Sequence, residues 1–121
     1  MDDEKKLRRV FGYQFSNIYD LYAQKVEAKG RTGDELDEML RWLTGYSPQQ
    51  LEVARSTETD LEQFITHAPA LNPARDQVTG VICGVRIEDI ENELMRELRI
   101  MDKLVDELAR GRAMEKVLRS P

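Results

Sequence analysis

One apolar stripe near the carboxyl end of the chain constrains the fold more than any other feature. Its residues recur at steps of four, four, three, four and three: Ile90, Leu94, Leu98, Met101, Val105 and Leu108. This spacing follows the 3.6-residue period of an α-helix, and Leu104 widens the stripe. Two oppositely charged pairs four residues apart lie on the other side: Lys103 with Glu107, and Asp106 with Arg110. The sequence therefore predicts one long amphipathic helix against which the other segments pack.

Shorter helices are predicted upstream by signals at their ends. The spacing of capping boxes, Ser or Thr followed three residues later by Glu or Gln, occurs at three positions: Thr32, Ser47 and Thr59. Ser16 is the expected N-cap of an earlier helix that ends at Gly30, and Asn72 is a cap followed by proline. With a short helix over 114–118, these signals predict an all-α, compact helical bundle of five to seven helices with a long C-terminal amphipathic helix.

The composition indicates one domain. The chain has 121 residues, of which 34% are charged and 40% are hydrophobic, as is typical of a helical globular protein. In residues 1–10, acids are followed by bases, and we expect a charged N-terminal tail there. Residues 11–121 are expected to form a single helical domain.

Residues 78–86 leave two structures open. The stretch is rich in β-branched residues and is interrupted by Gly80 and Gly84. A strand here would be buried, with the glycines marking a close approach, whereas in a helix the two glycines would share a face. Periodicity does not decide so short an apolar run, and we favour the helix because its neighbours are helical.

The charge balance argues against nucleic-acid binding. The formal net charge is −5, which disfavours unspecific contact with phosphates. Residues 34–44 and 48–55 have the outline of a helix-turn-helix, but the segment from Thr32 to Thr66 holds eight acids and two arginines. Beyond the tail of residues 1–10, the only basic cluster consists of Arg110, Arg112, Lys116 and Arg119, offset by Glu115. We therefore expect no nucleic-acid partner.

The single cysteine and residues 1–10 indicate the cellular compartment of the protein. Cys83 has no second cysteine to pair with, which favours a reducing, cytoplasmic location, and its apolar neighbours predict a buried, inert thiol. No signal peptide is visible in residues 1–10, and the longest apolar run, 81–85, is too short to span a membrane. We expect a cytoplasmic protein with no membrane partner.

Several stretches resemble one bacterial family. They are KGRT (29–32), WLTGY (42–46), LNPAR (71–75), TGVICGVRIEDIE (79–91), LMRELR (94–99) and DKLVDELARGRAMEKVLR (102–119). The residues of these motifs and their order along the chain resemble the family called domain of unknown function 2200, over nearly the whole chain after Arg9. The resemblance implies a bacterial cytosolic protein and supplies no activity, cofactor or catalytic residue. One departure is Glu93, where the family pattern has a proline.

No catalytic or metal-binding set is predicted. Acids crowd the start of the long helix at Glu88, Asp89, Glu91, Glu93 and Glu97. The only histidine, His67, is not part of a Glu-x-x-His pair, so the di-metal bundle motif is missing, and acids at a helix start suit its dipole. A dyad of Cys83 with His67 has no further support in the sequence. We expect no catalytic residue, cofactor or metal ligand, so whether the chain is an enzyme stays open.

Two function classes remain. The favoured one is an interaction or regulatory module that forms a homo-oligomer through apolar helix faces, because Met95 and Ile100 lie outside the main stripe of the long helix. The alternative is a protein or minor enzyme that binds an anionic small molecule near a capped helix start. Its candidate ligand-binding residues are Asn72, Arg75, Thr79, Gly80 and Gly84.

Overall fold

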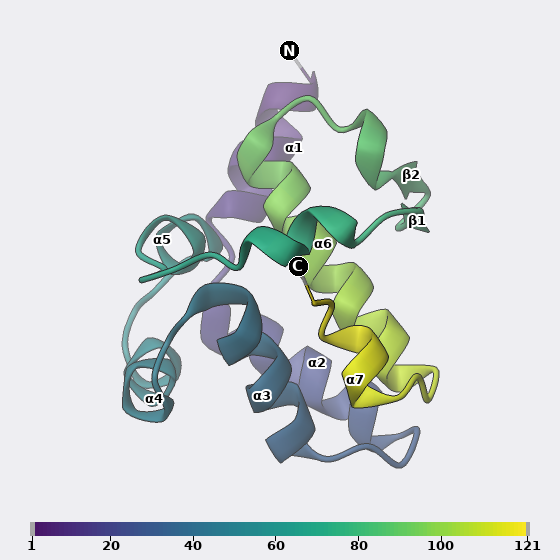
Figure 1. Cartoon of the computed structure of the whole chain (residues 1–121). Helices are drawn as coiled ribbons and strands as arrows, with labels where there is room; N and C mark the ends of the chain where they lie inside the picture. The colour runs from purple at the N-terminus through teal and green to yellow at the C-terminus, as the bar shows by residue number, and fades with distance from the viewer. Residues whose placement is uncertain (1, 121) are drawn as a thin grey trace.

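The computed structural model describes residues 2–120, and side chains from residue 5 onward (Figure 1). Within this range there are seven α-helices: α1 (Asp2–Phe11), α2 (Phe15–Glu27), α3 (Gly33–Thr44), α4 (Pro48–Ser56), α5 (Leu61–Thr66), α6 (Glu93–Ala109) and α7 (Met114–Val117). Two 3-10 helices, η1 (Pro73–Gln77) and η2 (Ile87–Asp89), flank an antiparallel hairpin of β1 (Val81–Ile82) and β2 (Val85–Arg86). The predicted all-α bundle is confirmed.

The long helix α6 is the centre of the core, as predicted. It packs against α2, α3 and α5, and α7 folds back along its second half (Figure 1). The predicted stripe is buried along most of its length: Leu98, Met101, Leu104, Val105 and Leu108 are all at most 2% exposed. The helix begins later than its apolar pattern, because the Asn92 side chain caps it by accepting from the Met95 N–H at 2.9 Å. Ile90 therefore lies before α6, not on it.

Two of the three expected capping boxes are present as predicted. At Thr32 and Ser47 the cap hydroxyl accepts from the backbone N–H three residues on, and the Glu35 and Gln50 side chains accept from the cap N–H. The third expectation, at Thr59, is wrong by one residue. Asp60 caps α5, and the Gln63 side chain completes the capping box. The Thr59 carbonyl accepts a hydrogen bond from the Phe15 N–H and so lies outside the helix.

The expected cap at Ser16 is also wrong. The first residue of α2 is Phe15, and its N-cap is Gln14, whose side chain makes no capping bond. A tertiary contact sets this boundary: the Phe15 N–H donates to the Thr59 carbonyl at 2.7 Å, and the Phe15 ring stacks on Phe64 at 3.8 Å between centroids. Burial of Phe15 therefore outweighs the hydroxyl cap one residue later.

The expected tail over residues 1–10 contains helix in the described part, because α1 covers residues 2–11. Arg8 and Arg9 lie in its last turn, where the helix dipole favours positive charge. Val10 and Phe11 are partly buried against the core, which ties the end of α1 to the body.

The favoured helix over residues 78–86 is wrong, and the strand alternative is right about the backbone. Cys83 and Gly84 form the turn, with φ angles of 52° and 77°. Positive φ at both central residues is what a two-residue type I′ hairpin turn requires. The strands are not buried, however: Val81 and Val85 are 53% and 42% exposed, and the Cys83 thiol, expected to be buried, is exposed.

Candidate functional site

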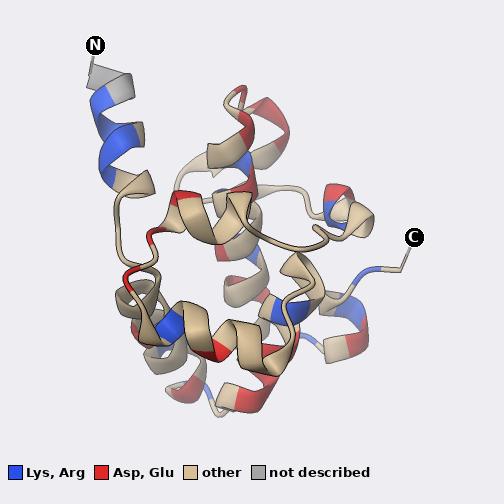
Figure 2. Ribbon diagram, turned by 90° about the vertical axis from the view of Figure 1, so that its left-hand side faces the viewer, with Lys and Arg blue, Asp and Glu red and all other residues tan. Residues whose placement is uncertain are grey.

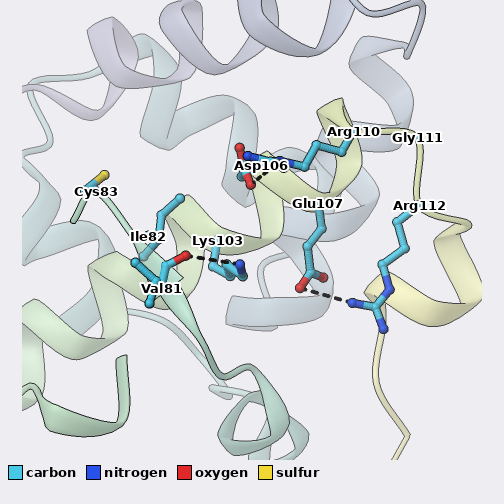
Figure 3. A pocket seen from close by; sticks show the side chains of 9 residues that line it. All are labelled: Val81, Ile82, Cys83, Lys103, Asp106, Glu107, Arg110, Gly111 and Arg112. Atoms are coloured by element: carbon cyan, nitrogen blue, oxygen red, sulfur yellow. Dashed lines mark hydrogen bonds and ion pairs between the residues drawn. The ribbon is translucent and has the colours of Figure 1, made fainter. Parts of the chain in front are cut away.

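A cleft of about 700 Å³ separates the hairpin from the second half of α6 (Figure 3). One wall is the hairpin, with Val81, Ile82 and Cys83. The other wall is α6 and the turn after it, which contribute five charged side chains: Lys103, Asp106, Glu107, Arg110 and Arg112. The cleft is open to solvent, and its size lies in the range of small-molecule sites.

A side-chain hydrogen bond joins the hairpin wall to α6 in this cleft, and Ile82 of the hairpin packs against the core. The Lys103 ammonium donates to the Val81 carbonyl at 3.2 Å (Figure 3). Among the side chains that the structure describes, no carboxylate lies within ion-pair distance of Lys103, so the expected pair of Lys103 with Glu107 is wrong. The reason is that Glu107 turns toward the C-terminal segment and is taken by arginines there.

Two carboxylates on α6 are each shared by two cations. Asp106 pairs with Arg110 at 2.8 Å, as predicted, and with Lys25 of α2 at 3.2 Å. The Glu107 side chain, only 8% exposed, pairs with Arg112 at 3.2 Å.

Glu107 also holds the end of the chain. Arg119 donates to both of its carboxylate oxygens, with the Nη2–Oε2 distance at 2.7 Å, so the pair is bidentate. Bidentate arginine–carboxylate pairs are strong and geometrically defined. The Arg31 side chain adds a third tie by donating to the Arg112 carbonyl at 2.8 Å. The turn that carries Arg110 and Arg112 is thus fixed from two sides.

The charge of this region is opposite to that of the whole chain. Lys103, Arg110 and Arg112 line the cleft together with Asp106 and Glu107, and Lys25 and Arg119 pair with these two acids from outside the lining. The lining carries an excess of one positive charge in a chain whose net charge is −5. An excess of positive charge in a concave site favours anions.

Two of the candidate residues, Asn72 and Arg75, lie together, and both make hydrogen bonds to other parts of the protein. The Asn72 side chain caps η1 by accepting from the Ala74 N–H at 2.9 Å. Arg75 donates to the Glu97 carboxylate of α6 at 2.8 Å and to the Asn72 carbonyl at 3.0 Å. The guanidinium thus clamps η1 to α6.

The other three candidates lie around the hairpin. Gly80 has a φ of 100°, and its N–H donates to Glu88 at 2.6 Å across the hairpin base. This bond lowers the pKa of Glu88 below its ordinary value of 4.5. Thr79 is exposed, and Gly84 lies in the turn with open space around it. The candidate residues therefore do not line the cleft, although Gly80 and Gly84 flank the hairpin that forms its wall.

The sequence pattern did not identify the cationic residues of the cleft as a site, although two of them lie in a visible basic cluster. Arg110 and Arg112 belong to the basic cluster near the carboxyl end, whose pattern in the sequence does not distinguish a nucleic-acid contact from a small-anion site. Lys103 could not be assigned, because its position over the hairpin depends on the fold of residues 81–86.

Two further depressions are mainly apolar. The first, which we name the α2 groove, lies between α1, α2 and α6, and Tyr13 and Leu21 on its rim are 43% and 58% exposed. The second, the α4 groove, lies beside α4 and includes Tyr46, Ala54 and Val53, of which Val53 is 58% exposed. At the α2 groove, the Tyr22 hydroxyl donates to Asp102 at 2.5 Å, and burial, followed by the Asp102 charge, raises the pKa of Tyr22.

The described residues, 2–120, hold neither a metal-ligand cluster nor a membrane-spanning helix. No group of three or more His, Cys, Asp or Glu side chains in this range is placed to hold a metal ion. No helix in the same range is long and apolar enough to cross a membrane.

Comparison with known proteins places the chain among bacterial proteins. The family model described as "Uncharacterized protein conserved in bacteria (DUF2200)" matches residues 9–119. Among solved structures, the chain is similar to "uncharacterized protein SP1917", with 37% sequence identity and a TM-score of 0.87, covering 92% of this chain and 91% of that one. No curated protein matches the sequence.

Proposed function

We propose that this chain, which belongs to the DUF2200 family of uncharacterised bacterial proteins, is a small binding module that takes up an anionic small molecule in the hairpin cleft. The observation that carries this proposal is the excess of positive charge around a concave site in an acidic chain. Lys103 is the central contact, since within the described part of the chain its ammonium donates to the Val81 carbonyl and pairs with no carboxylate.

The wall residues indicate the ligand class. Arginine guanidinium groups recognise phosphate and carboxylate oxygens, and Arg110 and Arg112 stand at one end of the cleft (Figure 3). Val81 and Ile82 supply an apolar surface on the opposite wall. This combination suits a phosphorylated or multiply carboxylated compound with an apolar part. All three arginines are paired with a carboxylate, but Arg75 is only 21% exposed, whereas Arg110 and Arg112 are 79% and 43% exposed. The expected anion site at Asn72 and Arg75 is therefore less suitable.

Amide chemical shifts recorded during titration with inorganic pyrophosphate and with citrate test this proposal. We expect shifts at Cys83, Gly111 and Arg112. Lys103→Gln is expected to weaken binding about fivefold, the effect of roughly 1 kcal/mol. Lys5→Gln removes one exposed charge from α1 and serves as the matched control. Absence of cleft shifts up to about 10 mM anion, or equal weakening by both variants, would overturn the proposal.

A second candidate function is a protein-interaction or regulatory module that self-associates. The long helix does not supply the surface, because Met95 and Ile100 are only 9% and 2% exposed and lie inside the chain. Exposed apolar residues at the two grooves, Leu21 and Val53, support the proposal instead. Sedimentation over a wide range of concentration tests it: a single 14.0 kDa species throughout would contradict self-association.

A cytoplasmic location is also proposed, and its support is the chain's single cysteine. Cys83 has no second cysteine with which to form an intramolecular disulfide, as is typical of proteins in reducing compartments. Fractionation of cells expressing the tagged protein tests the location, and recovery in an extracytoplasmic fraction would contradict it.

A further inference from the structure

We infer that Arg119, which does not line the hairpin cleft, is a positioning residue for it: by holding Glu107, it keeps Arg112 available to a bound anion. This inference deepens the proposed anion-binding function, on which it rests. It begins from a competition within the site. Arg112 lines the cleft and is also an ion-pair partner of Glu107, so a bound anion and the Glu107 carboxylate compete for the same guanidinium.

The contacts of Glu107 show which arginine it holds more closely. Arg119 meets the carboxylate as a fork: its Nη1 donates to Oε1, and its Nη2 donates to Oε2 at 2.7 Å. Arg112 approaches the same carboxylate less closely, with 3.2 Å between its Nη1 and Oε2. Because a forked arginine satisfies both oxygens of a carboxylate, Arg112 is the more weakly held of the two.

Exposure separates the two arginines in the same way. The Arg119 side chain is mostly buried and also donates to the Val117 carbonyl at 2.9 Å, so its position is fixed within the fold. Arg112 is exposed, and Arg31 fixes its backbone through the Arg112 carbonyl. The Arg112 guanidinium can therefore turn toward an anion without movement of the main chain. Glu107 then remains compensated by Arg119.

Loss of Arg119 would reverse this competition. The Glu107 side chain is only 8% exposed, and a carboxylate so far from water needs a cationic partner. Arg112 is its other ion-pair partner, so Glu107 would draw in the Arg112 guanidinium and withdraw it from the anion. The cleft would keep Lys103 and Arg110, of which Arg110 already pairs with Asp106. Docking of the C-terminal segment through Arg119 thus sets the anion affinity of the cleft.

Titration with inorganic pyrophosphate tests this role, with the amide spectrum of each variant as the check of its fold. Arg119→Gln is expected to weaken binding about tenfold, because the anion loses a charged hydrogen-bond donor to Glu107. Figure 2 shows the basic residues of α7 and of the segment after it in blue, next to the labelled C-terminus. Lys116→Gln, at an exposed position of α7, is the matched control. It removes the same charge from the same segment and is expected to change the affinity less than about twofold.

Two further variants separate positioning from other roles of Arg119. Arg119→Lys keeps the charge but cannot form the fork, so binding is expected to weaken about threefold, whereas a purely long-range effect of charge would leave it unchanged. The double variant Arg119→Gln with Glu107→Gln also removes the competitor of the anion. Its affinity is expected to return to within about twofold of the wild type, whereas a purely structural role would leave it as weak as Arg119→Gln.

The outcomes distinguish this inference from the proposed function. If Arg119→Gln or Arg119→Lys binds pyrophosphate as tightly as the wild type, or if the double variant stays weak, the positioning role is wrong while the anion cleft stands. If Arg119→Gln does not fold, Arg119→Lys and the double variant decide the matter in the same way. If the wild type itself does not bind pyrophosphate in the cleft, both are wrong.

Discussion

The two walls of the hairpin cleft are held in place by different kinds of interaction. On the α6 wall, the carboxylate of Glu107 is buried and holds Arg112 and Arg119, and Arg31 ties the same turn by a further hydrogen bond. On the hairpin wall, the side chains are largely exposed, and Lys103 and Glu88 supply the side-chain bonds to its backbone. The backbone that carries Arg110 and Arg112 is therefore fixed, whereas the apolar wall can adjust to a ligand.

The α6 wall should show the largest effect on stability. Glu107→Gln leaves the Arg119 guanidinium, 12% exposed, without its carboxylate partner. Because removing one member of a buried ion pair leaves an uncompensated charge, we expect a loss of about 3 kcal/mol in the free energy of unfolding. Urea denaturation measures it. Glu115→Gln, at an exposed site, is the control, and equal losses from the two changes would contradict the role of Glu107.

A smaller effect is expected at the hairpin turn. Gly84→Ala places a β-carbon where φ is 77°, although no atom lies near it, so the cost is backbone strain of about 1 kcal/mol. Cys83→Asn should act in the opposite direction, because Asn followed by Gly is the favoured pair for this turn. Hydrogen exchange of the β1 and β2 amides measures both. A loss of protection in the Asn variant would contradict the turn assignment.

The smallest effect should be seen on acidification. The folded pKa of Glu88 lies below its ordinary value of 4.5 because the charged form accepts from Gly80. Its contribution is thus present above pH 4.5 and is lost as the pH falls through the lowered pKa. Protection of the Gly80 amide should fall in acid, as hydrogen exchange can measure. In Glu88→Gln this pH dependence should be gone, and its persistence would show that another group is responsible.

Much of the fold could be predicted because its signals are local. The capping boxes at Thr32 and Ser47 involve residues three apart, and the stripe of α6 repeats within each turn. The resemblance to the DUF2200 family, which rests on short sequence motifs in a fixed order, is confirmed by the match over residues 9–119. The candidate site was harder, since only the basic cluster around Arg110 and Arg112 was visible in the sequence.

The sequence by itself determined the helical class, the long amphipathic helix and the starts of α3 and α4, because hydrophobic period and capping act within one or two turns. Only the tertiary structure decided the start of α2, the hairpin over residues 81–86 and the partners of Glu107 and Lys103. Each of these depends on groups distant along the chain: Phe15 meets Thr59 and Phe64, and Lys103 meets Val81. Such contacts exist only once packing has brought the segments together, so no local pattern encodes them.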